Sequence, residues 1–319
     1  MPEPLPIRQF DIDLAQPHPR AVVDGPLAMR PPPGLLITHR TRHSPDANPH
    51  PVRLAAVDVT SLGFQTDLML RALEGSEVID HPGYLTVRSP ANPEFWWGNF
   101  LLLPARAAHG AAAPWLELFR AEFPDAGHLA FGLDGTGDPE ADLDGFAAAG
   151  LELNRVTVLT AAALREPPRP NRDAVIRPLD GDSDWQQAVE LQVTCDAADG
   201  GPGSRTFTEA RYAARRRATD AGHGAWFGAF RDGELMAQLG IFSAHGRLAR
   251  YQDVGTHPAA RRQGLAGTLV WHAGQYALDQ LGASTLVILA DPEEAAIRLY
   301  RSVGFADRET QLSLQRVPS

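Results

Sequence analysis

The chain has 319 residues, 44% of them hydrophobic, which favours two packed domains over one. Its 29 Lys and Arg residues and 39 Asp and Glu residues give a net charge of −10, which argues against a general nucleic-acid-binding protein, because phosphate contacts need a basic surface. The one cysteine, Cys195, excludes an internal disulfide and favours a reducing compartment, and neither a secretory signal nor a membrane-length apolar run is visible, so we expect a cytoplasmic protein that does not enter a membrane.

Residues 1–50 hold 11 of the 27 prolines and show little apolar periodicity. We predict a Pro-rich N-terminal arm with little regular structure, apart from a candidate edge strand over residues 35–38. An arm that braces a homodimer is the alternative to a plain flexible terminus.

Residues 51–165 carry the signals of a folded domain. Apolar spacing predicts helices over 66–73, 115–123 and 143–149, and short apolar or alternating runs predict strands over 83–88, 94–103, 128–133 and 151–160.

A Pro-rich, charged break follows at residues 165–170, and we place the linker between the domains at 166–172. The second domain is then 173–319. Its predicted strands cover 174–179, 225–230, 235–242, 248–256, 285–290 and 305–314, and its predicted helices cover 182–194, 207–219, 265–281 and 294–303.

The two halves share a loose pattern of helix, glycine, strand, aspartate, helix, glycine and strand. Gly127 and Gly150 are 23 residues apart in the first half, and Gly282 and Gly304 are 22 apart in the second. This predicts a duplicated fold, with chance agreement as the alternative. The first half has Ala107 at the place of Arg261 and is expected to be a degenerate copy without catalytic activity.

Residues 254–266 predict the end of a strand, a tight basic loop and the start of a helix. Backbone N–H groups at a helix N-terminus have no partner within the helix, and the helix dipole adds positive potential there, so such a loop binds anions well. Gly264 lets the backbone approach a ligand closely, and Arg261 and Arg262 add charge. The loop therefore predicts a site for a phosphate-bearing cofactor.

The second half resembles the GNAT (GCN5-related N-acetyltransferase) superfamily. The acetyl-CoA loop of that family, [QR]-x-x-G-x-[GA], reads here as residues 261–266, and its Tyr and Gly-Phe segment reads as residues 296–305. The resemblance implies an α/β fold of two GNAT-like domains. Each would be a mixed, mostly antiparallel sheet flanked by helices and splayed between its fourth and fifth strands, which in the second half are 248–256 and 285–290.

The resemblance also implies where acetyl-CoA binds. The backbone of Val254 and Thr256 would pair with the pantetheine arm, and the Val254 amide would polarise the thioester carbonyl. Tyr300 would be the general acid that protonates the departing thiolate. The pyrophosphate would be held by the loop, whose implied binding residues are Arg261, Arg262, Gln263, Gly264, Leu265 and Ala266.

The sequence departs from the family pattern in two ways. Asp291 stands where many members have an Asn that contacts the cofactor, and the fourth strand has no Glu to act as base. Asp253 is a candidate base, although strand alternation can point its side chain away from the acceptor, so the base stays unassigned.

The leading hypothesis is an acetyl-CoA-dependent N-acetyltransferase that acts on a small-molecule amine or a peptide N-terminus by direct attack. The alternative is a non-catalytic protein that binds or senses acyl-CoA. No histidine spacing suggests a metal site. Cys195 is interpreted as a small buried side chain, His257 as a loop residue, and the Phe95–Trp97 aromatics as interface or strand packing. The sequence does not indicate which amine is the acceptor.

Overall fold

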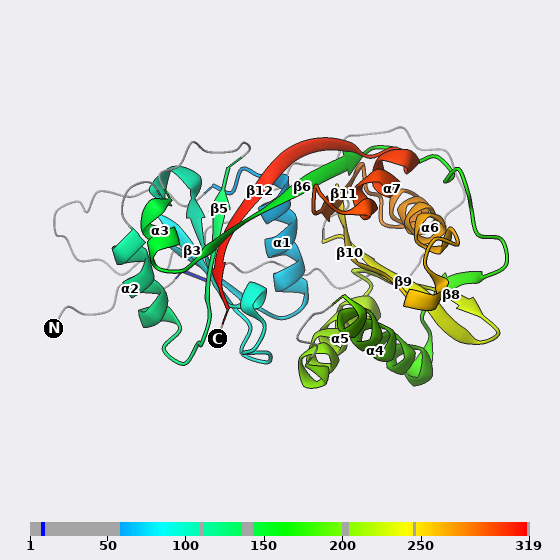
Figure 1. Ribbon diagram of the computed structural model, residues 1–319, viewed down its shortest axis with the longest axis horizontal. Coiled ribbons are helices and arrows are strands. Elements are labelled where there is room, and N and C mark those ends of the chain that lie inside the picture. The colour runs from blue at the N-terminus through cyan, green and yellow to red at the C-terminus, as the bar shows by residue number, and fades with distance from the viewer. Residues whose placement is uncertain are drawn as a thin grey trace, which may run out of the picture.

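The computed structural model of the protein describes residues 8–9, 58–108, 112–135, 143–199, 204–244 and 247–317. Its strands join one open sheet in the order β1-β2-β3-β4-β5-β12-β6-β11-β10-β9-β8-β7. Helices cover this sheet, and the molecule has two lobes that the sheet connects (Figure 1). The α/β class predicted from the sequence is confirmed.

The second half builds a sheet with helices on both faces. On β8, Phe227 faces the apolar side of α6, whereas its neighbour Trp226 faces α4 and α5, as strand alternation requires. The strands β7 to β10 are antiparallel neighbours, and β10 and β11 are parallel. The strands of this half are β7 (Val175–Pro178), β8 (Gly224–Arg231), β9 (Glu234–Phe242), β10 (Leu248–Thr256) and β11 (Thr285–Ala290); its helices are α4 (Gly181–Ala198), α5 (Arg205–Asp220), α6 (Leu265–Gln280) and α7 (Ala295–Val303).

The first half repeats this plan with shorter elements. Its β3 and β4 are antiparallel, β4 and β5 are parallel, and α2 makes the connection between the parallel pair, as α6 does between β10 and β11. The duplicated topology predicted from the glycine spacing is therefore present. The strands are β1 (Arg8–Gln9), β2 (Glu77–His81), β3 (Tyr84–Arg88), β4 (Phe100–Pro104) and β5 (Leu129–Asp134); the helices are α1 (Leu62–Leu73), α2 (Ala112–Glu122) and α3 (Asp144–Ala148).

The two halves exchange their last strands. β12 (Ala306–Arg316) lies between β5 and β6, and β6 (Glu152–Ala161) lies between β12 and β11, all in antiparallel pairs. Figure 1 shows β6 and β12 running side by side from one lobe to the other. The last strand of each half thus completes the sheet of the other half. The predicted linker at 166–172 falls between β6 and β7 in the chain, but it does not divide the sheet.

Several element boundaries differ from the sequence predictions for local reasons. The helix predicted from residue 66 begins at Leu62, because the hydroxyl of Ser61 accepts the Phe64 amide as an N-cap. The helix predicted from residue 207 begins at Arg205, because Ser204 caps α5 in the same way. The strand predicted over 94–103 starts only at Phe100, because residues 96–98 form a 3-10 turn. Strand β2 was not predicted, and the candidate strand at 35–38 lies outside the described residues.

Candidate functional site

Strands β10 and β11 separate soon after they begin. Their parallel register covers only residues 248–250 of β10, although that strand continues to Thr256 along β9. Against β9, the stretch between Gln252 and Gly255 contains one extra residue, a β-bulge. The splay predicted for the second half is therefore present. In the first half, by contrast, β4 and β5 stay paired to their last residues, Pro104 and Asp134, so the splay expected there is not seen.

The loop after β10 is shaped to hold an anion. Two of its residues have left-handed backbone conformations, Arg262 with φ 63° and Gly264 with φ 81°. Within the described part of the chain, the amides from Arg262 to Gly267 donate to no protein acceptor, and Thr268 is the first residue of α6 to donate, to Gly264 O at 3.1 Å. Free amides on a curled loop at a helix N-terminus form a concave anion site.

Gly264 has a further role that the sequence did not predict. A Cβ at this position would collide with the carbonyl oxygen of Arg169 and lie 3.1 Å from the Asn171 amide nitrogen. The Asn171 side chain also donates to Gln263 O at 2.8 Å, and its amide donates to the Thr268 hydroxyl at 2.8 Å. The segment between the halves therefore packs directly against the loop, and its approach requires a glycine here.

The two arginines of the loop have different surroundings. Arg261 makes a bidentate ion pair with Asp199 at 3.0 and 2.9 Å, and its Nε lies 3.3 Å from Thr256 O. The Asp199 carboxylate raises the pKa of Arg261. Arg262 is exposed. Arg261 thus ties the end of α4 to the loop, and Arg262 is the residue whose charge faces solvent.

Tyr300 is buried on α7, 5% exposed, with its ring 6.4 Å from that of Phe305. Its hydroxyl has no hydrogen-bond partner among the described residues. The hydroxyl oxygen is not fully enclosed, so it reaches accessible space. Burial, followed by the nearby Glu294 charge, raises the pKa of this phenol above its usual value. Tyr300 therefore keeps its proton at neutral pH and can donate it.

Asp253, the candidate base, lies in the bulge with a left-handed φ of 44°. Its carboxylate accepts from Arg211 Nη2 at 2.8 Å and from Arg215 Nη1 at shorter range. The carboxylate is thus ion-paired with two guanidinium groups, whereas a base must be free to take a proton from an amine. This pairing argues against Asp253 as the base.

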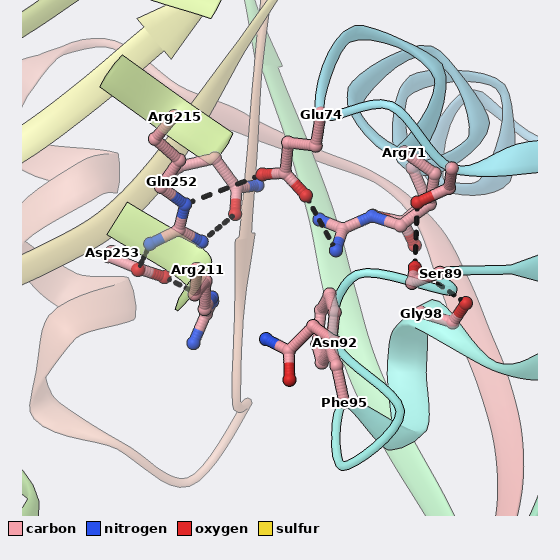
Figure 2. Close-up of polar contacts among 12 residues, drawn as sticks. Arg71, Glu74, Ser89, Asn92, Phe95, Gly98, Arg211, Arg215, Gln252 and Asp253 are labelled. Carbon is pink, nitrogen blue, oxygen red and sulfur yellow. Dashed lines mark hydrogen bonds and ion pairs between the residues drawn. The ribbon is translucent and has the colours of Figure 1, made fainter. Parts of the chain in front are cut away.

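These contacts belong to a larger interface ion network, which consists of Arg71, Glu74, Arg211, Arg215 and Asp253. Figure 2 shows Glu74 between the arginines of the two halves. Burial, and next the charge of Arg211, lower the pKa of Arg215 to about 9, so its guanidinium is still charged at neutral pH.

The helical spacing of α5 indicates which arginine of the run 215–217 is buried, although the charges alone do not. The run 215–217 suggests a basic helix end, but the buried positions of α5 share one face at spacings of four, three and three residues. They are Thr208, Tyr212, Arg215 and Ala218. Arg216 instead lies at the surface, 2.7 Å from Asp182. The helical face thus distinguishes the buried arginine from its neighbour.

The remaining candidates lie around the loop and the bulge. Asp291 is exposed after β11, and its carboxylate accepts the Glu293 amide at 2.8 Å. His257 Nδ1 accepts the Ala259 amide at 3.2 Å, so this histidine has the structural loop role expected. The Cys195 thiol is buried 3.4 Å from Thr256 O, and burial raises its pKa, which agrees with a small buried side chain.

The aromatic run of the first half packs at the boundary between the halves, as expected. The Phe95 ring lies 5.6 Å from that of Phe207, and Trp97 Nε1 donates to Gln315 Oε1 at 3.3 Å. Among the residues that the structure describes, no cluster of His, Cys, Asp and Glu could hold a metal ion, and no helix is long and apolar enough to span a membrane.

In the second half, the parallel pair β10 and β11 splays, and a loop with free amides follows β10, which is the arrangement that the family resemblance implied. Residues 185–305 match the family described as Acetyltransferase (GNAT) family. That match covers most of the second half of the chain, and the fold of this family supports acetyl transfer from acyl-CoA and generally binds acetyl-CoA. No curated protein matches the sequence.

Solved structures extend the likeness to the fold of both halves. A GCN5-related N-acetyltransferase from Kribbella flavida is 16% identical, with a TM-score of 0.56 over 81% of this chain and 95% of that chain. A GCN5-related N-acetyltransferase from Sphaerobacter thermophilus is 14% identical, with a TM-score of 0.55 over 78% and 84%. A functionally unknown conserved protein from Staphylococcus epidermidis ATCC 12228 is 10% identical, with a TM-score of 0.58 over 74% and 92%. At these identities the likeness concerns the fold alone.

Proposed function

We propose that the protein transfers an acetyl group from acetyl-CoA to a primary amine, either of a small molecule or of a peptide N-terminus, by direct attack of the amine. The observation that carries this proposal is the run of free amides from Arg262 to Gly267 beside the splay of β10 and β11. The residues fit the cofactor, because a pyrophosphate needs converging donors and the loop offers them without a competing protein acceptor in the described residues.

Each part of the site has one proposed task. The amides of the loop bind the pyrophosphate, with Arg261 and Arg262 adding positive charge. The backbone of Val254 and Thr256 lines the splay and pairs with the extended pantetheine, as an added strand pairs with a sheet edge. Asp291, at the end of β11, contacts the cofactor from the other side of the splay.

The chemistry needs a polarised carbonyl, a deprotonated amine and an acid. Acetyl-CoA supplies an activated thioester carbonyl, and in this proposal the Val254 amide stabilises the negative charge that develops on its oxygen. Tyr300 then donates its proton to the sulfur that leaves. The base remains unassigned, since Asp253 is ion-paired with two arginines.

A specific variant separates cofactor binding from folding. Gly264→Glu would confuse the two, because the Arg169 carbonyl fills the space beside Gly264. Ala266→Glu is better: Ala266 is partly exposed in the first turn of α6, where a carboxylate favours the helix by roughly 0.3–1 kcal/mol but repels a pyrophosphate. We expect calorimetry to show acetyl-CoA binding by the wild type and its loss in Ala266→Glu, with the melting temperature unchanged or higher.

Ala266→Gln is the matched control, because it adds the same bulk without the charge and should keep most of the affinity. Equal loss in both variants would attribute the effect to size, and an absence of binding by the wild type would refute the proposal.

The alternative is a protein that binds acyl-CoA without turnover. The ion pairs of Asp253 favour it, because they remove the carboxylate of β10 from proton transfer. A panel of amines assayed for release of free CoA thiol distinguishes the two functions: cofactor binding without thiol release on any amine would favour the sensor. The homodimer and the domain limits at 51–165 and 173–319 stay predictions.

A further inference from the structure

The interface ion network connects the first half of the chain to the bulge of the second half. Glu74 follows the last residue of α1 in the first half, Arg215 comes from α5, and Asp253 lies in the bulge of β10. Glu74 Oε1 is 3.4 Å from Arg215 Nε, and Arg215 Nη1 contacts Asp253 directly. The side chains are 7%, 0% and 14% exposed, so water screens these charges little.

The bulge depends on contacts from outside its own strand. Asp253 has a left-handed backbone at the point where β10 bulges against β9. Here Arg211 and Arg215 fix it by its carboxylate, and Arg215 also approaches Gln252 Oε1 at 3.4 Å. Val254 is the next residue, so the direction of its amide follows from how Asp253 is held.

Arg215 in turn depends on Glu74. Its guanidinium is fully buried and lies over the rings of Trp226 and Tyr212, at 5.0 and 5.4 Å. In the described residues, Glu74 and Asp253 are the carboxylates that contact it. Glu74 is also 2.9 Å from Arg71. Without Glu74, the Nε of Arg215 would lose its acceptor, and Arg215 would share the Asp253 carboxylate with Arg211, whose charge repels it. Arg215 would therefore shift.

We propose that the first half holds the reaction centre of the second half in its active shape, with Glu74 and Arg215 as positioning residues for the Asp253–Val254 bulge. This inference rests on the proposed function, because it assigns the Val254 amide to the thioester carbonyl. The first half is then a required part of the catalytic unit, acting through a buried chain of charges rather than through a contact with substrate.

The test measures the carbonyl itself rather than turnover alone. Acetyl-CoA labelled with ¹³C at the thioester carbonyl is bound to the wild type and to Glu74→Gln, and the carbonyl stretch is read by isotope-edited infrared spectroscopy. A hydrogen bond from Val254 lowers that frequency in the wild type. We expect Glu74→Gln to lose most of the shift while the Kd for acetyl-CoA from calorimetry stays nearly the same. CoA release on the best amine of the panel should fall roughly tenfold or more.

Two further variants separate positioning from general damage. Glu122→Gln breaks a half-buried ion pair with Arg88 inside the first half, at 2.5 Å, and should keep the full shift. The double variant Arg71→Gln/Glu74→Gln removes one charge of each sign, so it should regain the melting temperature lost in Glu74→Gln but not the carbonyl shift.

The outcomes distinguish this inference from the function on which it rests. An unchanged carbonyl frequency in Glu74→Gln, or a full recovery of the shift in the double variant, would overturn the positioning role and leave the acetyltransferase proposal standing. A wild type that does not bind acetyl-CoA would overturn both.

Discussion

The two parallel strand pairs, β4 with β5 and β10 with β11, have the same topology but different openings. The first pair stays hydrogen-bonded to the ends of both strands, and the register of β4 with β3 is regular. The second pair separates after three positions, next to a bulge. A shared topology thus does not by itself open the parallel pair; the opening occurs where β10 has its extra residue.

The aspartates that end the two fifth strands make the same point. In the first half, Asp134 is buried and accepts from the Ser61 amide at 3.1 Å and the Ser61 hydroxyl at 2.7 Å, and it also binds Thr60. In the second half, Asp291 is exposed and bonds only to its own turn among the described residues. In the first half, the aspartate at this position anchors α1. In the second half, the aspartate at the same position is exposed and could contact a ligand.

Separating the two halves should have the largest effect, because each half then loses a strand that completes its sheet. Expressed alone, residues 1–168 would lack β12 between β5 and β6, and residues 169–319 would lack β6 between β11 and β12. We expect neither fragment to unfold cooperatively on its own, as judged by circular dichroism against urea, and we expect the mixed fragments to recover a cooperative transition. Cooperative folding and acetyl-CoA binding by residues 169–319 alone would contradict the dependence between the halves.

The next largest effect should come from the two aspartates. Asp134→Ala removes several buried hydrogen bonds to a charged acceptor, so it should lower the free energy of unfolding by roughly 3 kcal/mol. Asp291→Ala should change it by less than about 1 kcal/mol, because the residue is exposed, yet weaken acetyl-CoA binding severalfold. Urea titrations and calorimetry measure both quantities. The reverse ranking of stabilities would show that the anchoring of α1 is not what Asp134 contributes.

Tyr300→Phe should have an effect on turnover alone. Its hydroxyl bonds to no described residue, so stability and acetyl-CoA affinity should hardly change, while release of CoA should slow by about a hundredfold if the phenol is the acid. Tyr276→Phe on α6 is the matched control, since its half-buried ring packs on Phe227 away from the proposed reaction. Equal rates for wild type and Tyr300→Phe would remove Tyr300 from the mechanism. The corresponding helix of the first half has the buried Phe146 and no such hydroxyl.

The sequence predicted those parts of the site that local chemistry specifies. The glycine, the flanking strand and the helix periodicity of α6 located the anion-binding loop, and the structure shows its free amides. The sequence did not locate the partners of Asp253 and Arg261, because their partners are 38 to 62 residues away and nothing local indicates such pairs. It likewise assigned Gly264 to a ligand, whereas the Arg169 carbonyl also demands it.

By itself, the sequence determined the resemblance of the second half to the GNAT family, the duplicated order of elements and the position of the loop, because these depend on residue type, spacing and turn preference. Tertiary structure alone decided the exchange of β6 and β12, the splay in one half and not the other, and the burial of Arg215 against Glu74. These features depend on which strand completes which sheet and which charge meets which across the interface. Such pairings are chosen by the whole packed chain, and no short stretch of sequence contains both partners.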